Sequence, residues 1–129
     1  MNEEKMKLLL NDAHKAAEFA YAPYSQFYVG AALLTDDGKI FTGCNIENAS
    51  FGAANCAERT AVFKAVSEGC RKFTAIAVVN KNGGLTFPCG ICRQVLAEFS
   101  PGIDVILEDE NGIPKIYRLT ELLPCSFSL

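Results

Sequence analysis

Residues 73–80 have the sequence F-T-A-I-A-V-V-N, a nearly continuous apolar run of strand length. Apolar residues at successive positions are typical of a strand that is covered on both faces. Helical patterns flank this run on each side, over 57–68 and 92–99. Alternation of strands with helices favours a layered α/β domain, with helices on both faces of one sheet. We therefore expect residues 73–80 to form a strand in the interior of such a sheet.

The remaining elements extend this pattern toward both ends of the chain. An amphipathic helix is predicted over 4–20, and its apolar positions are Leu8, Leu9, Ala13, Ala16, Ala17 and Ala20. Two strands, over 28–35 and 39–46, are predicted to pair through the tight turn D-D-G. Later elements are a strand at 103–109, a weaker strand at 116–119 after a break at Pro114, and a helical turn at 120–124. No repeat or linker interrupts the 129 residues, so we expect one domain spanning 1–129.

The composition excludes several classes of function. Half of the residues are apolar, a high share for a chain of this size, so association with other copies is expected. Net charge is −3 and the basic residues are scattered, whereas nucleic-acid binding needs a basic face that displaces counterions. The start of the chain lacks the apolar core of a signal peptide, and no later run has the length of a membrane span. We therefore predict a cytoplasmic protein with no nucleic-acid or membrane partner.

The cysteines carry the strongest chemical signal. In a reducing compartment the six cysteines favour metal ligands, nucleophiles or buried thiols over disulfides. Three of them begin two predicted helices, Cys56 in N-C-A-E-R and Cys89 and Cys92 in P-C-G-I-C-R. Helix N-termini stabilise thiolates, and a C-x-x-C pair chelates from one turn. Together the three thiolates predict one Zn²⁺ per chain with its fourth position open, as in catalytic zinc sites.

Two further residues of N-C-A-E-R suit catalysis. Glu58 follows Cys56 too closely to chelate comfortably beside it, so its expected role is proton transfer, first as general base and then as general acid. Three thiolates leave net negative charge on a zinc site. Arg59, one turn into the predicted helix, is placed to offset that charge. Asn55 is expected to cap this helix, and Gly69 to end it.

Other interpretations remain open on the motifs alone. The C-x-x-C pair also suits a thioredoxin-like redox protein, although that chemistry requires neither Cys56 nor Glu58. A non-catalytic, closed zinc site would take its fourth ligand from the remaining cysteines, with Cys44 best placed before Cys70 and Cys125. Otherwise these three are expected to be small buried apolar groups. His14 is the only histidine, so no catalytic triad is expected, and we assign it to the surface.

The order C-A-E at 56–58 and P-C-G-I-C at 88–92 resembles the zinc nucleoside deaminases, whose signature pairs a ligand-x-Glu with P-C-x-x-C. Here the first ligand is Cys instead of His. More narrowly, the chain resembles the small homotetrameric cytidine deaminases over nearly its whole length. The blocks that carry this likeness are A-Y-A-P-Y-S-Q-F-Y-V-G-A-A-L at 20–33, G-C-N-I-E-N-A-S at 43–50, C-A-E-R-T-A-V-F-K-A-V-S-E-G at 56–69, P-C-G-I-C-R-Q-V-L-A-E-F at 88–99 and E-L-L-P-C-S-F at 121–127.

This resemblance implies an α/β fold of three layers, α/β/α, around a five-stranded mixed sheet. It implies hydrolytic deamination of free cytidine and 2′-deoxycytidine to uridine and 2′-deoxyuridine, with release of ammonia, as in pyrimidine salvage. It also implies a homotetramer whose active sites are shared between subunits. The nearest rivals are a zinc deaminase of another aminated nucleoside, such as a blasticidin-type substrate, and a non-catalytic zinc or redox protein.

The resemblance also assigns roles to individual residues. Cys56, Cys89 and Cys92 would hold the zinc, Glu58 would be catalytic, and Arg59 would support the ligand thiolates. The substrate-binding residues would be Phe27 against the pyrimidine ring, Asn45 and Glu47 on sugar hydroxyls, the Ala57 N–H on the base carbonyl O2, and Phe127 in a neighbouring subunit's site. The family often has Tyr where this chain has Phe51, so contacts of that hydroxyl are not expected here.

Overall fold

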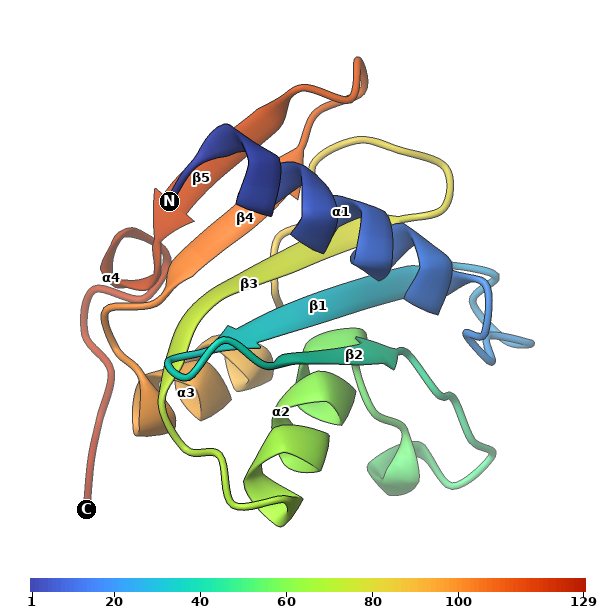
Figure 1. Ribbon diagram of the computed structural model, residues 1–129. Helices are drawn as coiled ribbons and strands as arrows, with labels where there is room; N and C mark the ends of the chain where they lie inside the picture. The colour runs from blue at the N-terminus through green and yellow to red at the C-terminus, as the bar shows by residue number, and fades with distance from the viewer.

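The computed structural model describes all 129 residues (Figure 1). In chain order its elements are α1 (Glu3–Ala17), β1 (Val29–Thr35), β2 (Ile40–Cys44), η1 (Phe51–Ala53), α2 (Ala57–Ser67), β3 (Phe73–Asn80), α3 (Gly90–Phe99), β4 (Asp104–Glu108), β5 (Pro114–Arg118) and α4 (Leu119–Leu122). No helix has the length and apolar character that a membrane span requires.

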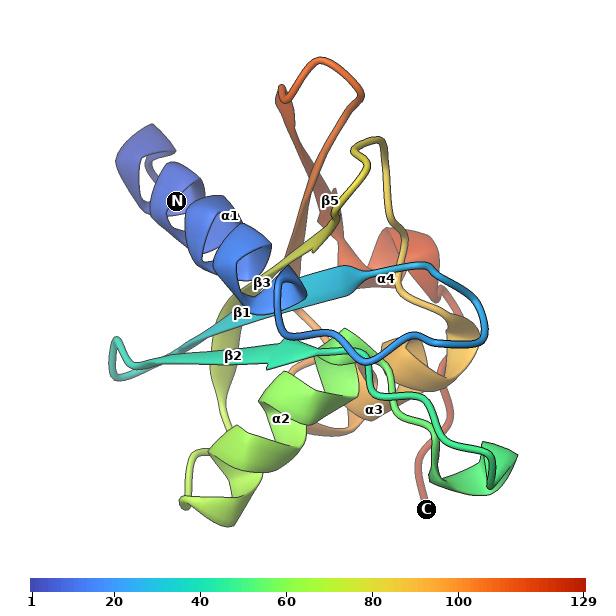
Figure 2. The same cartoon turned by 90° about the vertical axis from the view of Figure 1, so that its right-hand side faces the viewer.

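The strands form one five-stranded sheet in the order β2-β1-β3-β4-β5. The β3–β4 pair is parallel and every other pair is antiparallel, so the sheet is mixed. Helix α1 lies on one face of the sheet, and α2 and α3 lie on the other (Figures 1 and 2). The predicted three-layer α/β/α architecture is therefore confirmed.

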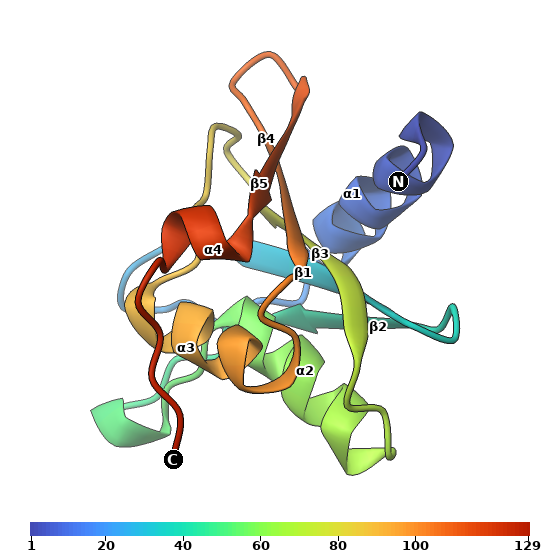
Figure 3. The same ribbon diagram turned by 90° about the vertical axis from the view of Figure 1, so that its left-hand side faces the viewer.

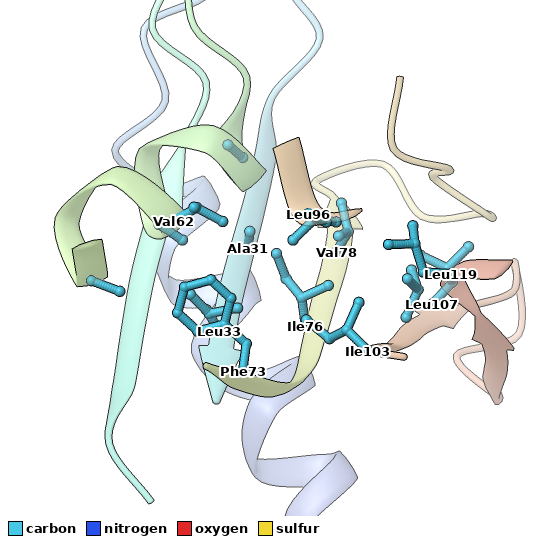
Figure 4. Close-up of a cluster of buried hydrophobic side chains, with 14 of the residues drawn as sticks. Ala31, Leu33, Val62, Phe73, Ile76, Val78, Leu96, Ile103, Leu107 and Leu119 are labelled. Atoms are coloured by element: carbon cyan, nitrogen blue, oxygen red, sulfur yellow. The ribbon is translucent and has the colours of Figure 1, made fainter. Parts of the chain in front are cut away.

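The central strand β3 is buried on both faces, as its apolar run predicted. Every residue of β3 except Thr74 is buried. Ile76 and Val78 point into the larger core, between the sheet and the α2–α3 layer, where they pack with Leu96 (Figure 4). The alternate residues Ala75, Ala77 and Val79 belong to a second core beneath α1. The strand thus supplies side chains to two separate cores with a period of two.

Some predicted boundaries and faces differ from the structure. Helix α1 ends at Ala17, three residues early, and buries Leu9, Leu10, Ala13 and Ala17. Leu8, predicted to lie on that face, remains 43% exposed. The side of α1 that packs against the sheet includes Leu10 in its place. Cys56, not Asn55, is the N-cap of α2. Pro114 begins the edge strand β5, where its missing N–H removes no bond from the sheet interior.

Two strand glycines let helices approach the sheet very closely. A Cβ added at Gly30 would lie 1.9 Å from the Ala13 carbonyl oxygen of α1. A Cβ added at Gly43 would lie 2.5 Å from both the Ala57 carbonyl oxygen and the Ala61 nitrogen of α2. The first turn of α2 therefore rests directly on β2, and Gly43 determines how deeply that turn sits.

Candidate metal centre and active site

Two helix N-termini bring the three predicted ligand cysteines together. Cys56 is the N-cap of α2 and Cys89 is the N-cap of α3; both have extended backbones, and neither side chain makes a capping hydrogen bond. Cys92 is buried in the first turn of α3. Because α2 and α3 lie on the same face of the sheet (Figure 3), their first turns meet and their thiols converge.

The sulfur geometry suits a tetrahedral metal. The Sγ atoms of Cys56, Cys89 and Cys92 all lie within 4.8 Å of one another. The Cys56–Cys89 Sγ distance is 3.7 Å. Zinc–sulfur bonds of about 2.3 Å in a tetrahedron place sulfurs about 3.8 Å apart. No further Cys, His, Asp or Glu belongs to this cluster, so Cys44 does not close the site as a fourth ligand.

Arg59 supplies positive charge to the thiol cluster. Its Nη2 donates to Cys56 Sγ at 3.2 Å, while its Nε is buried without a partner. A hydrogen bond from Cys92, with further ones from Arg59 and Cys89, lowers the pKa of Cys56 to about 5. The same Cys56–Cys92 hydrogen bond, together with burial, raises the pKa of Cys92. The cluster therefore favours at least one thiolate near neutral pH, the form in which cysteine binds metal.

Glu58 lies beside the cluster and away from solvent. Its side chain stands in the first turn of α2, and the residue is 5% exposed. Burial, with a smaller contribution from negative charge on Cys56, raises the pKa of Glu58 to about 7. A carboxyl group of this kind accepts and donates protons near neutral pH.

A cavity of about 160 Å³ contains most of the predicted site. Its lining residues are Phe27, Val29, Asn45, Cys56, Ala57, Glu58, Thr86, Phe87 and Cys89. A wider hollow of about 420 Å³ shares Asn45 and Cys56 with this cavity and adds Glu47, Phe51, Arg59 and Ile91, among others. Ala57 is the first residue of α2, so its N–H has no acceptor within the helix and is available to a ligand.

The chain matches a known protein family over this fold and site. The sequence pattern described as the cytidine and deoxycytidylate deaminase zinc-binding region matches residues 3–107. The chain belongs to the cytidine and deoxycytidylate deaminase family. It is 53% identical to a cytidine deaminase of Sporosarcina psychrophila, over 93% of this chain and 89% of that protein. It is 44% identical to a cytidine deaminase of Mycobacterium tuberculosis, over 100% of this chain and 94% of that protein.

Solved structures of this family have the same fold. The crystal structure of cytidine deaminase from Burkholderia pseudomallei aligns with a TM-score of 0.88 and 49% identity, covering 98% of this chain and 100% of that chain. Zinc is the metal of the matched family region, and the three-cysteine cluster is positioned to hold it. The sequence-based predictions of family, fold and cofactor are therefore confirmed.

Within this deaminase fold, Asn45 holds the segment that carries Phe27. Its Nδ2 donates to the Phe27 carbonyl at 2.7 Å, and its Oδ1 accepts the Val29 N–H at 2.9 Å. Both bonds run from the end of β2 to the start of β1. They keep the Phe27 ring at the cavity, where it is 47% exposed.

Phe127 does not reach the cavity of its own chain. It lies along α3, where its carbonyl accepts a hydrogen bond from Gln94 Nε2 at 2.9 Å, and it is 69% exposed. The structure therefore separates Phe127 from the other predicted site residues within one subunit. Its assignment to a neighbouring deaminase subunit stays a prediction.

Several residues near the site were not predicted from the sequence. Thr86 and Phe87 line the cavity, and the Phe87 ring packs edge-on against Tyr117 of β5 with centroids 5.2 Å apart. The position of Phe87 directly before Pro88 and a ligand cysteine was the available signal. Another is Arg93, which donates from Nε to the Pro88 carbonyl and from Nη1 to the Leu122 carbonyl, each at 2.7 Å.

His14 has no place in this site. It lies on α1, on the opposite face of the sheet from the cysteines, and hydrogen-bonds to Glu108 at the end of β4. Its side chain is 40% exposed, so it lies at the surface as predicted, in contact with Glu108.

Proposed function

We propose that the protein hydrolyses the C4 amino group of free cytidine and 2′-deoxycytidine, giving uridine or 2′-deoxyuridine and ammonia, a reaction of pyrimidine salvage. The observation that carries this proposal is the single cavity in which buried Glu58 and two ligand cysteines meet Phe27 and Asn45. A proton carrier and a metal site suit hydrolytic deamination, and an aromatic ring and an amide side chain suit binding of a nucleoside.

Glu58 moves the protons of the reaction. Zinc held by the three ligand cysteines would act as a Lewis acid and lower the pKa of water. Glu58 takes a proton from the attacking water and places it on N3 of the pyrimidine, which makes C4 electrophilic. After the C4–O bond forms, Glu58 takes the remaining hydroxyl proton and passes it to the amino group. The C4–N bond then breaks, C4 becomes a carbonyl, and ammonia leaves.

The other cavity residues would bind and orient the nucleoside. The Ala57 N–H donates to the base carbonyl O2, since it lacks a helical acceptor. The Phe27 ring packs on the pyrimidine. Asn45 and Glu47 pair with sugar hydroxyls through the hydrogen-bonding capacity that their contacts within the protein leave free, and an analogue lacking those hydroxyls leaves that capacity unused. That arrangement selects a nucleoside over a free base.

The active protein is proposed to be a homotetramer. Phe19, Phe51 and Phe127 are 82%, 83% and 69% exposed, which is unfavourable for aromatic rings in water. Phe51 and Ile91 also line the wider hollow beside the site, and η1, which carries Phe51, projects from the body of the subunit (Figures 2 and 3). A neighbouring copy would cover these side chains and close the hollow, with its Phe127 entering the site. Light scattering tests this, and a monomer at working concentration would contradict it.

The compartment is proposed to be the cytoplasm. All six cysteines are free thiols, and no pair forms a disulfide. Free thiols of this number are typical of proteins kept in a reducing compartment.

The decisive experiment follows the ultraviolet spectrum of cytidine mixed with purified protein, alongside a zinc-chelated sample. We expect conversion to uridine that disappears with the metal. Glu58→Gln should keep the zinc and lose turnover by several orders of magnitude, of about the size that removal of a proton carrier causes. Glu68→Gln, the same change at the other end of α2, is the matched control. A zinc-loaded oligomer that leaves cytidine unchanged would contradict the substrate, and a blasticidin-type aminonucleoside would be tested next.

A further inference from the structure

The turn that presents Phe27 to the cavity has a strained backbone. Gln26, directly before Phe27, has φ of 57° and is the only non-glycine residue of the chain with positive φ. Residues other than glycine rarely adopt this left-handed backbone conformation. It persists where surrounding contacts hold it in place. Gln26 itself is exposed, so its own side chain is not packed in a way that would impose the strain.

Besides the backbone bond from the Gln26 N–H to the Ala22 carbonyl and the bond from Asn45 to the Phe27 carbonyl, Glu47 supplies three of the hydrogen bonds that hold this turn. Its Oε1 accepts the Tyr24 N–H at 3.0 Å and the Ser25 N–H at 3.1 Å. Its Oε2 accepts the Ser25 hydroxyl. The Ser25 Oγ in turn accepts the Phe27 N–H at 3.1 Å. One hydroxyl therefore connects the Glu47 carboxylate to the backbone of Phe27.

Ser25 is placed to act through its neighbours and not by touching substrate. It lines neither the cavity nor the wider hollow, whereas Glu47 lines the hollow and Phe27 lines the cavity. An ionised carboxylate has about four acceptor positions, and the turn takes three of those on Glu47. The remaining capacity is available to a ligand, in an orientation that the turn fixes.

We infer that Ser25 is a positioning residue. Its hydroxyl holds the Glu47 carboxylate in the orientation that binds the sugar, and it holds the Phe27 ring in the orientation that packs on the base. This inference rests on the function proposed above. Sugar recognition and base packing are then coupled, since loss of the Ser25 hydroxyl removes one hydrogen bond from the Glu47 carboxylate and one from the Phe27 backbone. Consistent with this, the hydrogen bond from Ser25 is the main cause that lowers the pKa of Glu47.

The test compares Ser25→Ala with Ser25→Thr, which keeps the hydroxyl, on two substrates, cytidine and 2′,3′-dideoxycytidine. We expect Ser25→Ala to raise KM for cytidine about tenfold, as for loss of a hydrogen bond to a charged group, with a much smaller change in kcat. The KM increase should be clearly smaller for the dideoxy substrate, which lacks the 2′ and 3′ hydroxyls that Glu47 is proposed to bind. Ser25→Thr should restore KM to near the wild-type value.

Ser67→Ala is the matched control. Ser67 is also exposed, and its hydroxyl donates to the Lys64 carbonyl at 2.8 Å, but it lies at the far end of α2. Its KM for both substrates should equal that of the wild type. Zinc content and melting temperature, measured on every variant, separate a loss of folding from a loss of positioning.

Three results would overturn the inference while leaving the proposed function intact. They are an unchanged KM in Ser25→Ala, an equal KM increase for both substrates, and a loss that only follows zinc content or melting temperature. A wild-type protein that does not convert cytidine would overturn the proposed function first and this inference with it.

Discussion

Replacement of Gly43 by alanine tests how the sheet positions the metal centre. Gly43 lies in β2, and its backbone does not have the positive φ that disfavours alanine. The penalty of Gly43→Ala is therefore steric. The new methyl group would meet the backbone of α2 at Ala57 and Ala61, in the same turn that carries Glu58.

The size of the effect follows from the overlap. Moving the Ala57 carbonyl oxygen from 2.5 Å to an ordinary contact distance of 3.4 Å requires a displacement of about 0.9 Å. Overpacking of this kind costs about 1–3 kcal/mol of unfolding free energy. A misplacement of about 1 Å in a catalytic group costs about 100-fold in rate. We expect Gly43→Ala to lower kcat/KM for cytidine about 100-fold and to weaken zinc binding, because Cys56 precedes the displaced turn.

Gly30→Ala is the control for destabilisation alone. Its methyl group would meet the Ala13 carbonyl oxygen at 1.9 Å, on the α1 face of the sheet, away from the cysteines. Thermal melts should show destabilisation in both variants. Zinc content and kcat per folded molecule should fall only in Gly43→Ala. Wild-type zinc content and kcat/KM in a folded Gly43→Ala protein would refute the role assigned to this helix–strand contact.

Three further predictions test other parts of the structure. Arg93→Ala should speed zinc loss to a colorimetric chelator, because Arg93 ties the Pro88 carbonyl beside a ligand to Leu122; an unchanged rate would contradict this role. Titration with a thiol reagent should detect three more reactive thiols after zinc removal than before, and an equal titre would contradict the ligand set. Ile76→Ala should lower the unfolding free energy by about 2–5 kcal/mol in urea, as for a fully buried side chain; a smaller loss would mean that the core collapses around the site.

The sequence alone was sufficient for the central strand and for the three cysteines that the structure brings together. The apolar run of β3 predicted burial on both faces, because the side chains of a strand alternate between faces and all but Thr74 and Asn80 were apolar. Cys56, Cys89 and Cys92 were identified because a short spacing and two helix starts are local features. Glu58 and Arg59 follow from the same turn as Cys56. Family resemblance then predicted roles for Asn45, Glu47, Ala57, Phe27 and Phe127, which stay predictions.

Helix faces and ends were less well predicted. The sequence indicated an amphipathic first helix but favoured Leu8 for its buried face, where the structure buries Leu10. Apolar residues stand on both sides of that face, and the sheet surface beneath them decides which are covered. Asn55 is of a residue type that often caps helices, yet Cys56 occupies the N-cap position of α2. The Asn55 side chain instead donates a hydrogen bond to the Thr60 hydroxyl.

The sequence by itself thus determined the order of elements, the layer architecture and the cysteines of the cluster, because these depend on periodicity and spacing between near neighbours. Only the tertiary structure decided which distant groups meet. Ser25 bonds to Glu47 across 22 positions, and Arg93 to Leu122 across 29. Such contacts depend on strand register and helix placement, which are fixed by packing of the whole core and are not encoded in any single stretch of the chain.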